Sequence, residues 1–131
     1  MKRALAKLMP MVLAAWPLVA AAQYPEKPLR LIVPQAAGSA SDQIGRAIAA
    51  QLTTQLGQQV IVDNRPGGAL TIGMDAIAKA PADGYTIGLG VIGSMAINRH
   101  LVAKLPYDPD RDFQPLCLIS TGHLLLAVAP S

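Results

Sequence analysis

The stretch IVPQAAGSASDQIGRAIAAQL, residues 32–52, carries the strongest indication of the fold. It completes the apolar run LRLIV (residues 29–33), which is typical of a short strand ended by Pro34. Beyond a loop of small residues, apolar side chains recur every four positions, at Ile44, Ile48, Leu52 and Leu56. That spacing predicts the buried seam of an amphipathic helix, and so a strand–loop–helix unit of an α/β protein.

Both ends of this helix carry capping signals. Ser39 and Asp42 stand three residues apart, as in a capping box, and Ser41 is the alternative cap. Gly57 is placed to end the helix in a left-handed conformation. The predicted helix therefore begins close to the loop that follows the first strand.

The alternation of strands and helices continues along the chain. Strand-like runs occupy residues 59–63 and 85–90, and helix-like segments occupy 72–80 and 94–101. A proline-rich loop (105–113) and two apolar runs (115–120 and 123–129) follow. Strands that alternate with helices of this length predict a parallel-type sheet flanked by helices on both faces. Because the sequence ends directly after a strand-like run, we expect this α/β lobe to be incomplete.

The first 22 residues are typical of a cleaved export signal. Lys2, Arg3 and Lys7 precede an uncharged stretch over residues 8–19, and three alanines then lead to a cleavage point before Gln23. A membrane anchor is the alternative, but this stretch is shorter than the ~20 apolar residues a spanning helix needs, and Pro10 and Pro17 interrupt it. We therefore expect residues 1–22 to be a signal peptide, residues 23–131 to form the lobe, and the protein to be periplasmic.

Removal of that signal changes the charge of the chain. The sequence has 11 basic and 8 acidic residues, and three of the basic ones lie in the signal, which leaves 8 of each. A net charge near zero gives no reason to expect nucleic acid or an anionic membrane as a partner.

The loop at residues 34–41 is the main candidate for binding chemistry. It joins a predicted strand to a predicted helix, where ligands of open α/β sheets bind and where free N–H groups favour an anion. Neither GxGxxG nor a phosphate-binding loop ending in GK[ST] is present, and Asp42 would repel a phosphate. A carboxylate carries less charge and is therefore the better candidate ligand for this loop. An ordinary strand-to-helix loop with a normal cap is an equally good interpretation of these residues alone.

Other chemistry is sparse in the sequence. His100 and His123 are the only histidines and lack a second ligand at helical spacing, so we expect no metal site, and no cofactor motif is present. No GxSxG elbow or other catalytic constellation occurs, so we expect no enzyme. Cys117 is the only cysteine, which excludes an internal disulfide, and its apolar run predicts a buried inert thiol. Arg99 has no evident partner.

Several segments together match a known family. They are YPEKPLRLIVP (24–34), GSASDQIGR (38–46), LGQQVIVDNRPGG (56–68), ADGYTIGLG (82–90), AIN (96–98) and LPYDPDRDFQPL (105–116). In this order and spacing they resemble the extracytoplasmic solute receptors of tripartite tricarboxylate transporters, the Bug family. The resemblance covers essentially the whole chain after the signal.

The resemblance implies the first of two α/β lobes of a periplasmic binding protein, which close on a small carboxylate. Such a receptor presents its ligand to two membrane subunits and is expected to be a monomer. Carried onto this sequence, the resemblance places four residues of the first loop at the ligand, through backbone, hydroxyl and water contacts: Gly38, Ser39, Ser41 and Asp42. The loop at 90–94 faces the same cleft and adds Ser94.

The chain also departs from the family pattern. Gln35, Ala36, Ala37 and Ser39 replace an aromatic residue, prolines and paired glycines, and Leu70 occupies a position where glycine is preferred. Val91 and Ile92 stand where small polar residues are common. Family members run to twice this length or more, as expected for two lobes. Two alternatives stay open: a truncated, non-functional remnant of such a receptor, or a periplasmic ligand sensor without a transport role.

Overall fold

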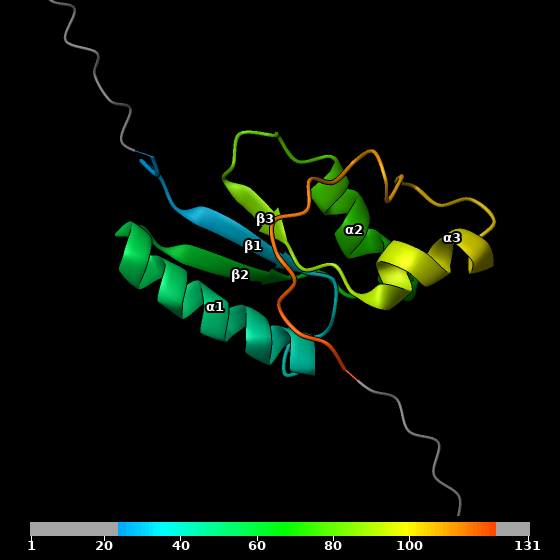
Figure 1. The fold of residues 1–131 in the computed structure, drawn as a ribbon, viewed down its shortest axis with the longest axis horizontal. Helices are drawn as coiled ribbons and strands as arrows, with labels where there is room; N and C mark the ends of the chain where they lie inside the picture. The colour runs from blue at the N-terminus through cyan, green and yellow to red at the C-terminus, as the bar shows by residue number, and fades with distance from the viewer. Residues whose placement is uncertain (1–23, 123–131) are drawn as a thin grey trace, which may run out of the picture.

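The computed structural model describes residues 24–122, in which three parallel strands form one sheet in the order β2–β1–β3 (Figure 1). β1 spans Leu29–Val33, β2 spans Val60–Asn64 and β3 spans Thr86–Gly88. The central strand β1 pairs with both neighbours, so that Leu31 stands opposite Val62 on one side and Ile87 on the other. The three predicted strands are confirmed, although β3 is shorter than predicted.

Helices cover both faces of the sheet, as predicted. α1 (Ala40–Leu56) connects β1 to β2 on one face, and α2 (Thr71–Ala78) connects β2 to β3 on the other, where it contacts β1 and β3. Figure 1 shows the sheet between the two helices. The parallel sheet flanked by helices is therefore confirmed.

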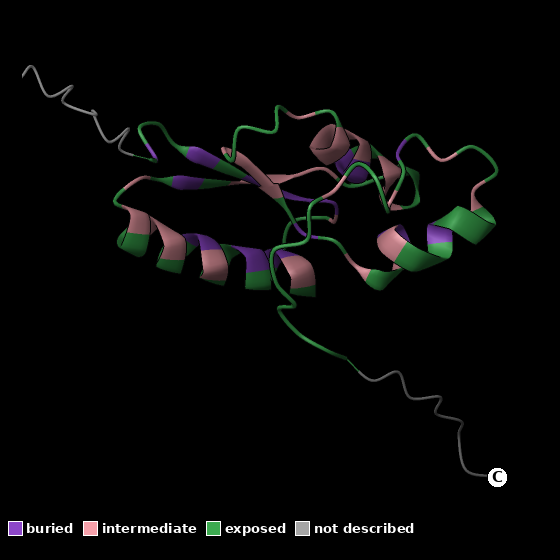
Figure 2. Ribbon diagram, turned by 45° about the horizontal axis from the view of Figure 1, so that its top comes forward, coloured by how far each residue is buried: buried purple, intermediate pink, exposed green. Residues whose placement is uncertain are grey.

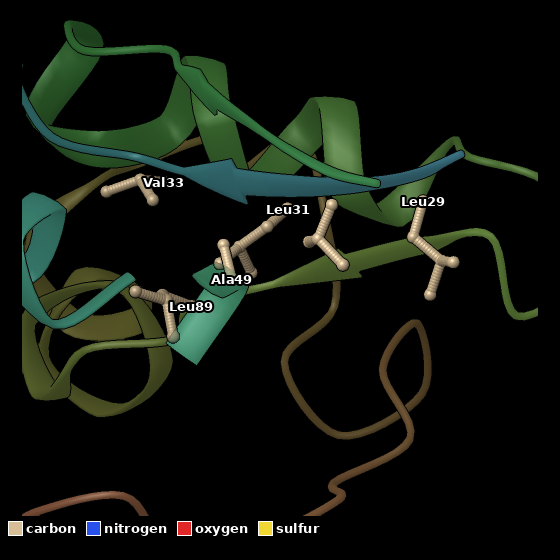
Figure 3. Packing of buried hydrophobic residues seen from close by; sticks show 6 residues of the cluster. Leu29, Leu31, Val33, Ala49 and Leu89 are labelled. Atoms are coloured by element: carbon tan, nitrogen blue, oxygen red, sulfur yellow. The ribbon is translucent and has the colours of Figure 1, made fainter. Parts of the chain in front are cut away.

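The core lies between the sheet and α1. Leu29, Leu31 and Val33 occupy alternate positions of β1, and together with Ala49 of α1 and Leu89 they belong to one hydrophobic cluster (Figure 3). This arrangement follows from the two-residue period of a strand, which sends every second side chain to the same face. The intervening Ile32 is also buried, and the alternation of side chains along β1 places it on the opposite face, which α2 contacts.

The buried seam of α1 differs from the predicted one. Ile44 is exposed and Ile48 only half-buried, whereas Gly45 and Ala49 face the sheet. A Cβ atom on Gly45 would lie only 3.1 Å from Val33 Cγ2, so small residues let the helix approach the strand closely. The prediction weighed side-chain apolarity and missed that close packing here selects small volume. Further along α1, Leu52 and Leu56 pack against the core as predicted.

Both predicted caps of α1 are confirmed. Ser39 is the N-cap, its Oγ accepting a hydrogen bond from the Asp42 N–H at 3.2 Å, while Asp42 Oδ2 accepts from the Gly38 N–H at 2.8 Å. The first bond is that of a capping box, whereas the second differs from it, because Asp42 accepts from the residue before the N-cap and not from Ser39 itself. Gly57 ends the helix with φ 67°.

A strained turn precedes α2. The 3₁₀ turn Gly68–Leu70 places two non-glycine residues in the left-handed region, Ala69 with φ 51° and Leu70 with φ 77°. A left-handed conformation costs a residue with a Cβ about 1–2 kcal/mol. Leu70, at the position where the family prefers glycine, therefore adopts a conformation that glycine tolerates better.

Replacing Ala69 with glycine is expected to raise the free energy of unfolding by up to ~1 kcal/mol, because it relieves this strain at an exposed position. Chemical denaturation of the full chain measures the change. Ala50→Gly on the exposed side of α1 is the matched control and should lower stability by ~1 kcal/mol. Equal losses at both positions would contradict the assignment of strain to Ala69.

Beyond β3 the chain forms a π-helical turn (Gly93–Ile97) that runs into α3 (Asn98–Leu101), in agreement with the predicted helical segment. The predicted proline-rich loop follows. Residues 114–122 have no regular structure and lie exposed (Figure 2). The prediction of a buried Cys117 is wrong, because its apolar run pairs with no strand edge in the described region and the thiol is exposed.

Two predictions fall outside the described residues: the signal peptide at 1–22 and the apolar run at 123–129. Within residues 24–122, no helix has the length and apolar character required to span a bilayer.

Candidate functional site

The candidate site lies at the edge of the sheet where the strands end. The loops that follow β1, β2 and β3 leave from this same edge, because the three strands are parallel (Figure 1). From β1 the chain passes over one face to β2, and from β2 it returns over the opposite face to β3. The carboxyl end of β1 is therefore a topological switch point, the place where open α/β sheets bind ligands.

The loop after β1 presents backbone donors at this point. Gly38 turns the chain with φ 83°, and Ala36, Ala37 and Gly38 are exposed. Within residues 24–122, the N–H groups of Ala40 and Ser41 have no hydrogen-bond acceptor. They begin a helix of 17 residues, whose dipole adds partial positive charge at the same place. Ser39 and Ser41 are half-buried beside these groups.

Asp42 lies beneath the loop and holds it together. Its carboxylate is buried and accepts hydrogen bonds from Arg46 Nε (3.0 Å), the Gly38 N–H (2.8 Å) and Asn64 Nδ2 (2.9 Å). These donors, with Arg46 first, lower the pKa of Asp42 to about 2, so the group is ionised at neutral pH. Both carboxylate oxygens are thus engaged by groups of the protein itself.

The sequence did not predict that Asn64 and Arg46 take part in this network. Asn64, the last residue of β2, also donates to the Gln35 carbonyl at 3.1 Å and accepts from Arg46 Nη2 at 3.2 Å. Asn64 thereby ties the loop after β1 to the neighbouring strand. The available signals were the position of Asn64 at the end of a strand and the four-residue spacing of Asp42 and Arg46.

Ser94 belongs to the loop that follows β3. It is fully buried, and its hydroxyl donates to the Val91 carbonyl at 2.9 Å and accepts from the Val91 N–H at 3.2 Å. The structure therefore brings together Gly38, Ser39, Ser41 and Asp42 at the start of α1. It places Ser94 in the loop of an adjacent strand, with the hydroxyl directed to the backbone of Val91.

Other features of the described region lie away from these residues. An open hollow of about 510 Å³ is lined by α3 and the following loop, among them Arg99, Leu105 and Tyr107, and by none of the five candidate residues. No group of three His, Cys, Asp or Glu side chains in residues 24–122 is arranged to hold a metal ion. The carboxyl edge of the sheet remains the best-built candidate site.

Comparison with known proteins identifies the family. The sequence model of the family described as "Tripartite tricarboxylate transporter family receptor" matches residues 44–131. The chain belongs to this family. It is a family of solute-binding receptors, and the resemblance found in the sequence is confirmed.

Two curated relatives give the extent of the similarity. A UPF0065 protein from the tcbD–tcbE intergenic region of Pseudomonas sp. (strain P51) is 41% identical over 105 residues, which are 80% of this chain and 31% of the relative. Protein BugT of Bordetella pertussis is 37% identical over 113 residues, 86% of this chain and 35% of the relative. The chain thus spans about a third of the length of the curated relatives it matches.

Solved structures show the same fold. MatC from Rhodopseudomonas palustris, solved with bound malate, superposes with a TM-score of 0.70 at 33% identity over 73% of this chain and 33% of its own. R. palustris Rpa4515, solved with adipate, gives 0.64 at 39% identity over 66% and 29%. The periplasmic binding protein BugD gives 0.66 at 36% identity over 70% and 30%. The described region therefore matches part of a periplasmic binding protein.

Proposed function

We propose that this chain provides a ligand-binding lobe of an extracytoplasmic receptor for a small carboxylate. The observation that carries the proposal is the pair of unused N–H groups, Ala40 and Ser41, at the start of a long helix and at the switch point of the sheet. Membership of the receptor family supports it, as do two structural neighbours solved with the carboxylates malate and adipate.

The donor inventory of the loop favours a carboxylate over a phosphate. The bonds of Gly38 and Asp42 already use two N–H groups, and within residues 24–122 Ala40 and Ser41 offer two adjacent unbonded N–H groups at the start of the helix. Two donors suit the two oxygens of one carboxylate. The ionised Asp42 beneath the loop disfavours an anion of higher charge.

Each candidate residue has a proposed part in binding. Gly38 gives the loop its turn, and Ser39 and Ser41 donate their hydroxyls beside the free N–H groups. Asp42 acts indirectly, since its oxygens are occupied, by fixing the loop in shape. Ser94 contributes from the adjacent loop, where it fixes Val91.

The cellular role follows from the family rather than from the site. We propose that residues 1–22 are a cleaved signal peptide and that the mature chain is periplasmic and monomeric, without catalytic activity. Its ligand would be delivered to the membrane subunits of a tripartite tricarboxylate transporter. A second lobe, as in two-lobed receptors, would close over the carboxylate bound at the loop after β1 and increase its burial.

Alanine substitutions at two glycines separate binding from stability. Gly38 (φ 83°) and Gly57 (φ 67°) both have positive φ and open space where a Cβ would lie, but Gly57 is at the opposite end of α1. Each substitution should lower the free energy of unfolding by about 1 kcal/mol. Only Gly38→Ala should also weaken malate binding. If ~1 kcal/mol of strain in the altered loop is subtracted from the binding free energy, the affinity falls about 5-fold.

Isothermal titration of the full chain with malate, and then with adipate, measures this difference. Equal affinities of Gly38→Ala and Gly57→Ala would count against the loop as the binding element. Failure of the unaltered chain to bind either acid would contradict the proposed function itself.

A further inference from the structure

The loop after β3 depends for its shape on one buried side chain. The Ser94 hydroxyl bonds both the carbonyl (2.9 Å) and the N–H (3.2 Å) of Val91, which closes residues 91–94 into a turn. Ser94 is fully buried, so no water competes for these bonds. Any group that fixes Ser94 therefore fixes the turn as well.

Ser94 lies inside the π-helical turn Gly93–Ile97. There the Asn98 N–H donates to the Gly93 carbonyl, five residues back, rather than to the Ser94 carbonyl, four residues back. The Ser94 carbonyl accepts from the Tyr107 hydroxyl at 2.7 Å. π-helical turns are rare, occur frequently at functional sites, and require compensation for the displaced backbone bonds.

Tyr107 is held firmly by its own surroundings. Its side chain comes from the loop at 105–113, only 5% of it is exposed, and its ring stands edge-on to Phe113 with centroids 5.6 Å apart. Because the bond to Ser94 is buried, its loss would leave a carbonyl without its partner in the protein interior. Tyr107 therefore gives the π-helical turn a rigid attachment point.

A second attachment between the same segments is weaker. Arg99 of α3 pairs with Asp110 through two contacts of 3.0 and 3.1 Å and donates to the Met95 carbonyl at 3.3 Å, which corrects the expectation that Arg99 lacks a partner. Both side chains are more than a third exposed, and such pairs contribute little. The Tyr107 bond is the buried one of the two attachments.

We propose that Tyr107 is a positioning residue for the ligand-binding edge of the lobe. It holds the loop after β3 in its binding conformation through the relay Tyr107 hydroxyl, Ser94 carbonyl, Ser94 hydroxyl and Val91 backbone. Tyr107 itself makes no contact with the ligand. The proposal rests on the proposed function, because it assigns the loop at 89–94 to the carboxylate site.

The test compares two tyrosine-to-phenylalanine variants of the full chain. Tyr107→Phe removes the hydroxyl that bonds Ser94, and Tyr24→Phe removes one that bonds the Gly84 carbonyl at 2.6 Å, before β3 begins. Amide hydrogen exchange is followed at Val91 and Met95, whose N–H groups bond within the turn, and at Leu31 of the central strand. Malate affinity is then measured for both variants by calorimetry.

In Tyr107→Phe we expect exchange at Val91 and Met95 to accelerate about 3- to 10-fold, with Leu31 unchanged and malate affinity reduced by a similar factor. Tyr24→Phe should leave all three quantities unchanged. Unaltered exchange in the turn, equal acceleration at Leu31, or undiminished malate affinity in Tyr107→Phe would each overturn the proposal. Failure of the unaltered chain to bind malate would instead contradict the proposed function, and exchange would still decide whether Tyr107 holds the turn.

Discussion

Asp42→Ala is expected to destabilise the lobe more than removal of any other carboxylate in residues 24–122. The substitution leaves the Gly38 N–H, Arg46 and the Asn64 amide without their shared acceptor. The carboxylate itself is buried, and hydrogen bonds to a charged group contribute more to stability than those between neutral groups. The bond from the N–H of residue 42 to Ser39 Oγ involves the backbone and remains.

Two variants calibrate this result. Asp75→Ala removes a carboxylate that also pairs with a cation four residues on, Lys79, but lacks backbone and amide partners, so it should cost only about 0.3–0.5 kcal/mol. Ser39→Ala removes the cap oxygen alone and should cost about 1 kcal/mol. Thermal unfolding of the full chain should show a larger loss in Asp42→Ala than in either. A loss no greater than that of Asp75→Ala would contradict the central role of Asp42.

The same carboxylate gives the lobe a defined acid sensitivity. The pKa of Asp42 is lowered from 3.8 to about 2 in the folded chain, so its contribution is fully present above pH 4 and is lost as pH falls toward 2. The pKa values of Asp63, Asp83 and Asp110 are lowered too, so the unaltered chain has several contributions in this range. Asp42→Asn should flatten the fall in unfolding free energy between pH 4 and 2. An unchanged slope would show that Asp42 is not the group concerned.

Gly73→Ala is expected to lower the free energy of unfolding by about 2 kcal/mol, within the range for overpacked cores. A Cβ at this position would lie 2.6 Å from Pro34 Cα and 2.8 Å from the Arg65 carbonyl oxygen. Both neighbours are backbone atoms, so no side-chain rotation relieves the collision. The ~1 kcal/mol that alanine gains over glycine inside a helix only partly offsets this cost.

This collision links the fold to the site. Pro34 and Arg65 begin the loops that follow β1 and β2, so displacement of α2 moves the carboxyl edge of the sheet. Gly122→Ala is the matched control, because its Cβ would have no atom within 4 Å, and stability should change by less than ~0.5 kcal/mol. Equal unfolding midpoints for the two variants in urea would contradict the close packing of α2 on Pro34.

Local patterns predicted the elements of the lobe well. The strand runs, the Ser39 N-cap and the Gly57 C-cap depend on neighbouring residues, and each was found where the sequence indicated. In the first half of α1 the buried seam is displaced by one residue, because the space above β1 admits Gly45 and Ala49 but not isoleucine. Cys117 was assigned to a core on apolarity alone, and its segment lies exposed in the described part of the chain.

The candidate residues lie in loops at the carboxyl edge of the sheet, as the sequence predicted, but the contacts between them depend on distant residues. Asn64 lies 22 residues from Asp42 and Tyr107 lies 13 residues from Ser94, and no local pattern predicts either hydrogen bond. The sequence did not indicate that Asp42 is buried either. Whether the candidate residues meet a ligand remains a prediction.

The most direct test of the binding loop is a malate titration of the isotope-labelled full chain, followed by amide chemical shifts. If the loop after β1 holds the carboxylate, the largest saturable shifts will belong to the N–H groups of Ala40 and Ser41, with smaller ones at residues 89–94. Shifts confined to the hollow beside Arg99 and Tyr107, or no saturable shift at any amide, would contradict a carboxylate site at the start of α1.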